Sequence, residues 1–347
     1  MPMKLVHGGD LSSASRKFGI AKEQWIDLST GISPWSWPVP NVPEIVWQSL
    51  PDVNDGLEQV AADYYGCDTR ALLPVSGSQD GLQAIPFLLE QGTVAMPVRG
   101  YEEHRLAWCN AGHEIVPYQS AEQLQQLVST GQVTHAVVIN PNNPTGEVID
   151  RQLLMGLQQK LKESGGWLLV DEAFIDVLPE NSLATECPSS GLIVLRSIGK
   201  FFGLAGLRLG FVLAPSALLQ RLEEQLPPWN VSHPARWIGK QALDDVAWHR
   251  TQRQRLQSMS EQWCQQLAAR FTSLKFIASS LFVSGIGSPG LCEDIYRELG
   301  QRGVLIRVFD EIAGQRMVRF GLPTEEELPK VLKVLDQVTE GQLCTVG

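Results

Sequence analysis

The sequence predicts an α/β fold in which a mostly parallel sheet of seven strands is covered by helices on both faces. Between about residues 70 and 215, short apolar runs alternate with stretches of helical pattern. The runs are rich in Val, Ile and Leu, which is typical of strands buried on both faces, and polar motifs follow several of them directly. The predicted strands are 72–75, 93–96, 114–116, 136–139, 167–170, 192–195 and 211–213.

The regions on either side of this sheet differ from it. Residues 1–40 are irregular and rich in proline, so they predict an arm that cannot form a core alone, and residues 44–65 carry helical signals that stop at Gly66. Residues 234–275 predict a long, polar connecting helix, and residues 276–347 alternate strand-like and helical pieces. We therefore expect an arm at 1–40 that joins a small domain, a large cofactor-binding domain at 41–230, and the connecting helix and small α/β domain at 231–347.

Composition excludes several classes of function. A net charge of −10 argues against nucleic acid or an anionic membrane as the main partner. The six cysteines lack the spacing of a metal site or a disulfide framework, so we expect free thiols in a reducing compartment and no metal centre. The N-terminus lacks the apolar core of a signal peptide, and no run approaches the ~18 apolar residues of a membrane span. These observations predict a cytoplasmic protein.

Residues 196–210 contain a single lysine, Lys200, among small and apolar residues, with four glycines at 199, 203, 206 and 210. Burial disfavours a charged amine, so the pKa of Lys200 should fall and its amine should become nucleophilic. Schiff-base chemistry requires such an amine. The alternative is an ordinary lysine that reaches solvent from a glycine-rich turn at a strand end.

Three other motifs follow predicted strands. Gly77, Ser78 and Gln79 open a helix whose backbone N–H groups suit a phosphate, although Ser and Asp residues here are equally good helix caps. Asn143, in Asn140-Pro141-Asn142-Asn143-Pro144-Thr145-Gly146, is placed to donate to a ligand oxygen, although this composition also suits a turn. Asp171 ends an apolar strand and needs a partner, which a protonated ring nitrogen, a helix cap or an arginine would each supply.

The spacing of these motifs decides between the alternatives. Asn143 and Asp171 are 28 residues apart (171 − 143), and Asp171 and Lys200 are 29 apart (200 − 171), so each interval allows one helix and one return strand. All of them should meet at the edge of the sheet where the strands end. An amine, an acid, an amide donor and a phosphate loop at one edge match the requirements of pyridoxal 5'-phosphate.

The combined motifs resemble those of fold-type I pyridoxal-phosphate enzymes, in the histidinol-phosphate aminotransferase-like branch. The resemblance rests on Asn142-Asn143-Pro144-Thr145-Gly146, on Asp171-Glu172-Ala173-Phe174, and on Ser197-x-x-Lys200 with Ala205-Gly206-Leu207-Arg208. His7-Gly8-Gly9, residues 27–34 and Leu50-Pro51-Asp52 are most similar to threonine-phosphate decarboxylases of cobalamin (vitamin B12) biosynthesis. The resemblance therefore implies decarboxylation of L-threonine O-3-phosphate to (R)-1-amino-2-propanol phosphate and CO2 by a homodimer.

The same resemblance implies a role for individual residues. Lys200 would form a Schiff base with the cofactor aldehyde, Asp171 would pair with the pyridine nitrogen, Asn143 would donate to the ring oxygen and Tyr101 would stack on the ring. The cofactor phosphate would be held by Gly77, Ser78, Gln79, Ser197 and Arg208. Arg319 would bind the substrate carboxylate, which is the role of the matching arginine in the aminotransferases. The other candidates for the substrate are His7, Gly8, Ser29, Gly31, Asn143 and Arg307.

Three positions depart from the family pattern. Leu50 stands where many relatives have a tyrosine that reaches the partner's cofactor phosphate, so this contact is either missing or supplied by Tyr64 or Tyr65. Phe174 stands where many aminotransferases have a tyrosine, which would leave Asn143 as the main donor to the ring oxygen. Gly199 stands where many relatives have a serine just before the lysine, so the phosphate site would have one hydrogen-bond donor fewer.

The sequence leaves the choice of reaction open. The bond that breaks at Cα must lie perpendicular to the cofactor ring, and the residues alone do not fix that angle. A histidinol-phosphate-type aminotransferase that uses the same cofactor site is therefore the alternative enzyme. A catalytically silent protein that binds the cofactor for regulation is the alternative outside enzymes.

Overall fold

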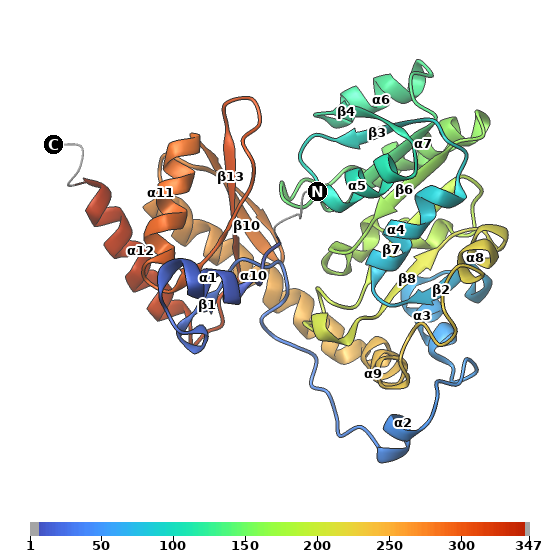
Figure 1. Ribbon diagram of the computed structural model, residues 1–347, viewed down its shortest axis with the longest axis horizontal. Coiled ribbons are helices and arrows are strands. Elements are labelled where there is room, and N and C mark those ends of the chain that lie inside the picture. The colour runs from blue at the N-terminus through green and yellow to red at the C-terminus, as the bar shows by residue number, and fades with distance from the viewer. Residues whose placement is uncertain (1–6, 344–347) are drawn as a thin grey trace. The chain divides into compact units, whose positions relative to one another are not determined.

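The computed structural model describes residues 7–343 and divides them into two compact units, which we describe separately (Figure 1). One unit contains residues 7–35, 144–146 and 252–343 and is called the small unit. The other contains residues 36–143 and 147–251 and is called the large unit. The boundary predicted at residue 230 lies within the large unit, and the chain passes back into the small unit after residue 251.

The large unit is built on a seven-stranded sheet whose strands coincide with all seven predicted runs. The strand order is β2-β8-β7-β6-β5-β3-β4. All pairs are parallel except those of β8, which runs antiparallel to both β2 and β7. The strands are β2 (Leu72–Val75), β3 (Thr93–Pro97), β4 (Glu114–Tyr118), β5 (His135–Ile139), β6 (Trp167–Asp171), β7 (Leu192–Ser197) and β8 (Gly210–Leu213). The prediction of a mostly parallel, seven-stranded sheet is confirmed.

Helices cover both faces of this sheet. On one face, Ile193 and Leu195 of β7 pack into a cluster with apolar residues of α4 (Ser78–Leu88), α5 (Glu102–Asn110) and α8 (Ser216–Glu223). Leu192 and Val194 point to the opposite face and are also fully buried. The remaining helices of seven residues or more in the large unit are α3 (Leu57–Tyr65), α6 (Ala121–Ser129), α7 (Arg151–Glu163) and α9 (His233–Asp244). Burial on both faces explains why the strands read as continuous apolar runs.

Two predicted helical regions are each divided in two. Residues 44–65 form α2 (Glu44–Gln48) and α3, with non-helical backbone between them. Residues 234–275 form α9 and α10 (Val246–Arg270) rather than one helix. The break falls at Asp245, whose carboxylate accepts the Trp248 N–H at 3.0 Å and the Trp37 indole N–H at 3.1 Å. This carboxylate starts a new helix in the way that an N-cap residue does.

The small unit contains a four-stranded antiparallel sheet and a two-stranded parallel one. The larger sheet has the order β12-β13-β10-β9, and the smaller pairs β1 with β11. The strands are β1 (Ile26–Asp27), β9 (Lys275–Ser279), β10 (Phe282–Gly287), β11 (Val304–Leu305), β12 (Arg307–Val308) and β13 (Arg316–Gly321); the helices are α1 (Leu11–Phe18), α11 (Pro289–Gly300) and α12 (Leu328–Leu343), together with most of α10.

The N-terminal segment is more regular than predicted. Residues 11–18 form α1 because the Asp10 carboxylate accepts the Ser13 N–H at 3.0 Å and caps the helix. Residues 26–27 add β1 beside β11. The largely apolar run at 304–308 is interrupted at Ile306, so that β11 and β12 belong to different sheets. In the part of the chain that the structure describes, no helix is long and apolar enough to cross a membrane.

Candidate active site

The predicted phosphate loop connects β2 to α4 in the large unit. Gly77 is the N-cap residue of α4 and, because glycine has no side chain, it makes no side-chain hydrogen bond to the first turn. Its φ of +85° favours glycine. A Cβ atom at Gly77 would lie 2.6 Å from Nη2 of Arg208, so glycine is also needed for the close approach of this guanidinium. The helix therefore starts at a glycine and not at a Ser or Asp N-cap residue.

The antiparallel strand β8 brings two other predicted residues to this loop. Gly210 is paired with Val75 of β2 on one side and with Ser197 of β7 on the other. A Cβ atom at Gly210 would lie 2.3 Å from the Ser78 backbone nitrogen. Arg208 precedes β8 and has a φ of +54°, an uncommon conformation for a non-glycine residue. The loop, Ser197 and Arg208 therefore lie at the same edge of the sheet.

Asp171 ends β6 and is buried, and its partner is a histidine that no motif in the sequence indicates. Its carboxylate lies 2.9 Å from Nε2 of His104 and accepts the Ala173 N–H at 3.0 Å. His104 is fully buried on α5, and its Nδ1 has no hydrogen-bond partner among the described residues. This places the ring proton on Nε2, where it is donated to Asp171. The one available signal was that His104 follows Tyr101 by three residues, one helical turn.

The remaining predicted residues of the large unit belong to neighbouring loops. The Tyr101 hydroxyl donates to Oε1 of Gln79 at 3.2 Å. The loop that contains Asn143 is fixed beside residues 99–101, because the Asn142 amide donates to the Arg99 carbonyl at 2.8 Å. Nζ of Lys200 lies 5.7 Å from the centroid of the Phe174 ring, three residues beyond Asp171.

Gly199 also has a local reason to be glycine. A Cβ atom at Gly199 would lie 3.2 Å from Cα of Ala205. The Gly199 N–H donates to the Ser197 hydroxyl at 3.3 Å. The departure from serine at this position is therefore matched by the close packing of the turn that carries Lys200.

A buried ionic cluster lies beside these residues in the sequence. Arg196, directly before Ser197, forms ion pairs with Glu172 and Asp176, and Nη1 of Arg196 also donates to the Ser182 hydroxyl at 3.0 Å. The pKa of Glu172 is raised by burial, which Arg196 opposes. The cluster fixes the two chain segments that follow β6 and precede Lys200.

Tyr64 and Tyr65 belong to this cluster, which bears on the position of Leu50. The Tyr64 hydroxyl donates to Asp176 at 3.0 Å, and the Tyr65 ring lies 4.3 Å from Cζ of Arg196. Burial raises the pKa of Tyr65 well above its ordinary value. Both tyrosines are thus engaged inside their own chain, whereas Leu50 is 65% exposed.

The small unit contains two of the predicted substrate residues, Arg307 and Arg319, on neighbouring strands. Arg307 and Arg319 face each other across β12 and β13. Burial, together with the charge of Arg307, lowers the pKa of Arg319 to about 10, and burial also lowers the pKa of Arg307. The centroid of the Phe309 ring lies 5.2 Å from Cζ of Arg307 and 5.6 Å from Cζ of Arg319. A buried cation, Arg319, beside a half-buried one, Arg307, on adjacent strands favours an anionic ligand.

The N-terminal residues of the predicted set meet the same strand. Nη2 of Arg319 donates to the Ser29 carbonyl at 2.7 Å, and the Ser29 hydroxyl donates to Asp27 at 2.5 Å. A Cβ atom at Gly8 would lie 2.2 Å from the Ser29 carbonyl oxygen, so the chain at Gly8 approaches Ser29 closely. Gly31 is buried and His7 is exposed.

Comparisons with known proteins identify the family of this chain. The family model described as aminotransferase class I and II matches residues 49–335. A threonine-phosphate decarboxylase of Pseudomonas aeruginosa is 43% identical over 322 residues, which cover 93% of this chain and 94% of that protein.

Solved structures share the fold. A histidinol-phosphate aminotransferase from Sinorhizobium meliloti in complex with pyridoxal-5'-phosphate aligns with a TM-score of 0.83 at 20% identity over 98% of this chain and 96% of that one. An L-threonine-O-3-phosphate decarboxylase from Porphyromonas gingivalis aligns with a TM-score of 0.74 at 18% identity over 90% and 99%. The chain therefore belongs to the aminotransferase class I and II family and, within it, to the family of the threonine-phosphate decarboxylases.

Proposed function

We propose that this chain decarboxylates L-threonine O-3-phosphate to (R)-1-amino-2-propanol phosphate and CO2 in cobalamin biosynthesis, with pyridoxal 5'-phosphate as cofactor. The observation that carries the proposal is the 43% identity to a threonine-phosphate decarboxylase over 93% of the chain. The predicted cofactor residues of the large unit fit this cofactor, because the glycine loop that Arg208 closely approaches suits a phosphate and the buried pair of Asp171 and His104 suits a protonated ring nitrogen.

Each residue of the large unit has a defined task in this proposal. The Lys200 amine binds the cofactor aldehyde, and Gly77, Ser78, Gln79, Ser197 and Arg208 hold the phosphate. Asp171 accepts the ring N–H and keeps it protonated, Asn143 donates to the ring oxygen and Tyr101 covers the ring. When bound, pyridoxal 5'-phosphate supplies the electron sink that receives the electrons of the broken bond.

The substrate is dianionic at its phosphate and anionic at its carboxylate, so it requires cations. We assign the carboxylate to Arg319 and the phosphate end to Arg307 with His7, Gly8, Ser29 and Gly31, and Asn143 is shared with the cofactor. For decarboxylation, these residues would have to hold the substrate so that the bond from Cα to the carboxylate is the one that breaks, and Lys200 or a water would return a proton to Cα. For transamination, the same residues would have to keep the carboxylate in place while the proton leaves Cα, so the reaction depends on how they orient the substrate.

The experiment that tests the proposal supplies purified protein with pyridoxal 5'-phosphate and L-threonine O-3-phosphate, without any keto acid. We expect many CO2 molecules per chain with one phosphorylated amine for each. Threonine and histidinol phosphate serve as substrate controls and should release no CO2. Conversion of one amino group per chain without CO2 would instead establish the aminotransferase.

Replacing Lys200 by alanine separates an enzyme from a silent cofactor-binding protein. We expect turnover to fall by at least about 10²–10⁴-fold, the range for loss of a positioned proton-transfer group, together with loss of the absorbance band of the bound cofactor. Arg297→Ala, at an exposed ion pair on α11, is the control and should leave both readouts unchanged. A Lys200→Ala variant that turns over normally would exclude the assignment.

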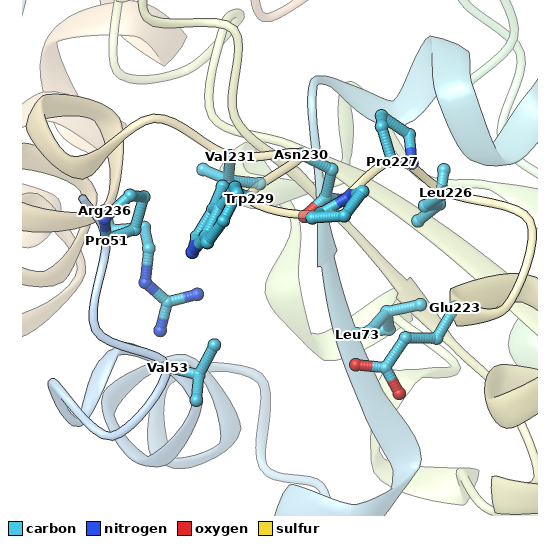
Figure 2. A pocket seen from close by; sticks show the side chains of 11 residues that line it. Pro51, Val53, Leu73, Glu223, Leu226, Pro227, Trp229, Asn230, Val231 and Arg236 are labelled. Atoms are coloured by element: carbon cyan, nitrogen blue, oxygen red, sulfur yellow. The ribbon is translucent and has the colours of Figure 1, made fainter.

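We further propose that the protein is a cytoplasmic homodimer. Four large apolar side chains on and after α2 are each exposed by more than 60%, namely Ile45, Trp47, Leu50 and Val53. Exposed apolar surface is typical of interfaces. Val53 and Trp229 line a cavity of about 270 Å³ in the large unit (Figure 2). The family resemblance implies that a second copy of the chain covers this exposed surface.

Sedimentation of the purified protein tests the homodimer. The measured mass should be twice the chain mass of 38.3 kDa, and Trp47→Glu should shift this mass toward that of the monomer.

A further inference from the structure

Glu103 lies in the first turn of α5, between two residues that contact the candidate cofactor site. Tyr101 directly precedes α5, and His104 on the same turn contacts Asp171 at 2.9 Å. Glu103 is half-buried and faces α4, where Oε2 of Glu103 accepts from the side-chain amides of Gln79 at 3.3 Å and Gln83 at 2.9 Å. It has no direct task in the proposed reaction.

The chemistry of these groups fixes the direction of the Gln79 amide. An ionised carboxylate only accepts hydrogen bonds, so the NH₂ group of Gln79 must face Glu103. The carbonyl oxygen of the same amide then points the other way, where it accepts the Tyr101 hydroxyl at 3.2 Å. With the amide reversed, an oxygen would face the carboxylate and an NH₂ group would face the hydroxyl.

We infer that Glu103 is a positioning residue for the cofactor site, which fixes the amide of Gln79 and through it the ring of Tyr101. The inference rests on the proposed function in one respect, because that function has Tyr101 cover the cofactor ring. The negative charge of Glu103 also acts on Tyr101 directly: burial raises the pKa of Tyr101 to about 12, and Glu103 is the next largest cause.

The competing role for Glu103 is to link α4 to α5 without any effect on Tyr101. The chain offers matched controls for this alternative. Gln83→Leu removes the shorter hydrogen bond between Glu103 and α4 but leaves Gln79 intact. Glu102→Gln removes a neighbouring charge that pairs with Arg105 on the exposed side of α5.

The first measurement uses protein without cofactor, labelled with ¹³C at the tyrosine ring carbon that carries the hydroxyl. The chain has five tyrosines, and Tyr101→Phe identifies the resonance of interest. We expect Glu103→Gln to shift the Tyr101 resonance and to lower its pKa, whereas Gln83→Leu and Glu102→Gln leave both unchanged. An unchanged resonance in Glu103→Gln, or an equal shift in Gln83→Leu, would overturn the inference.

The second measurement is the dissociation constant for pyridoxal 5'-phosphate. Glu103→Gln should weaken binding by about three- to tenfold, the effect of disturbing one or two hydrogen bonds. The same substitution in a Gln79→Leu background should weaken binding clearly less, because the part of its effect that passes through Gln79 is already lost there. Equal weakening in both backgrounds would contradict the inference. Absence of cofactor binding by the unmodified protein would contradict the proposed function, while the tyrosine resonance would still decide the role of Glu103.

Discussion

Arg196 in the large unit and Arg319 in the small unit are both buried arginines on strands, yet their surroundings are opposite. Arg196 is in contact with two carboxylates, Glu172 and Asp176, whereas Arg319 donates to the Ser29 carbonyl and faces Arg307 across the strand pair. Burial lowers the pKa of both groups, but the carboxylates outweigh it at Arg196, whose pKa lies above its ordinary value. At Arg319 the neighbouring cation lowers the pKa further, to about 10.

The difference separates a charge that stabilises the fold from a charge suited to a ligand. The positive charge of Arg196 is compensated inside the protein, so this side chain has little left to offer an anion. Arg319 is held in surroundings that disfavour its charge, and an anionic ligand would relieve this. The two arginines should therefore respond differently to substitution.

The largest expected effect on stability is that of Arg196→Leu. This change leaves Glu172 and Asp176 buried without their cation, so the free energy of unfolding should fall by about 3–5 kcal/mol. Denaturant titration of the variant and the unmodified protein measures the difference. A loss below about 1 kcal/mol, the range for an exposed pair, would show that Arg196 does not stabilise the fold in this way.

The pH dependence of substrate binding should follow Arg319. Because its pKa is about 10 in the folded protein, below the ordinary 12.5, Arg319 is protonated at neutral pH and loses its charge as the pH rises through 10. The value of kcat/KM for threonine phosphate should then fall about tenfold one pH unit above that pKa. Arg196 stays charged there because its pKa is raised. A value of kcat/KM that is constant through this range would argue against Arg319 as a substrate ligand.

The smallest effect is expected at an exposed arginine. Arg297 is about half exposed and pairs with Asp294 one turn away on α11. Arg297→Ala should change the free energy of unfolding by about 0–1 kcal/mol, since water and salt already screen this pair. A larger loss of unfolding free energy in the same denaturant titration would mean that burial does not decide how much an arginine contributes to stability.

Much of the large unit could be predicted from the sequence because its strands are buried on both faces. Their apolar runs are continuous, so each strand and the polar motif after it can be located without neighbours. The positions of Lys200, Asp171 and the Gly77 loop after these strands can be predicted in this way, and the structure places Gly77, Ser197 and Arg208 at one edge of the sheet. The fold and the family are confirmed by the comparisons.

What could not be predicted depends on contacts between distant residues. His104 and Asp171 are 67 positions apart and share no motif. The two-residue strands β1 and β11 are too short to show a period. Arg196 and Arg319 each follow apolar residues in a strand. The sequence alone therefore does not show that Arg196 is paired with carboxylates and that Arg319 lies beside another arginine.

The most direct test of this difference is to replace Arg319 by glutamine and measure stability and substrate binding on the same preparation. We expect the free energy of unfolding to change by about 1 kcal/mol or less, because the lost hydrogen bond to Ser29 is offset by removal of a charge beside Arg307. The affinity for L-threonine O-3-phosphate should fall by about 10- to 100-fold, as for loss of hydrogen bonds to a charged group. A variant that unfolds 3–5 kcal/mol more easily, as expected for Arg196→Leu, and still binds the substrate normally would contradict this interpretation.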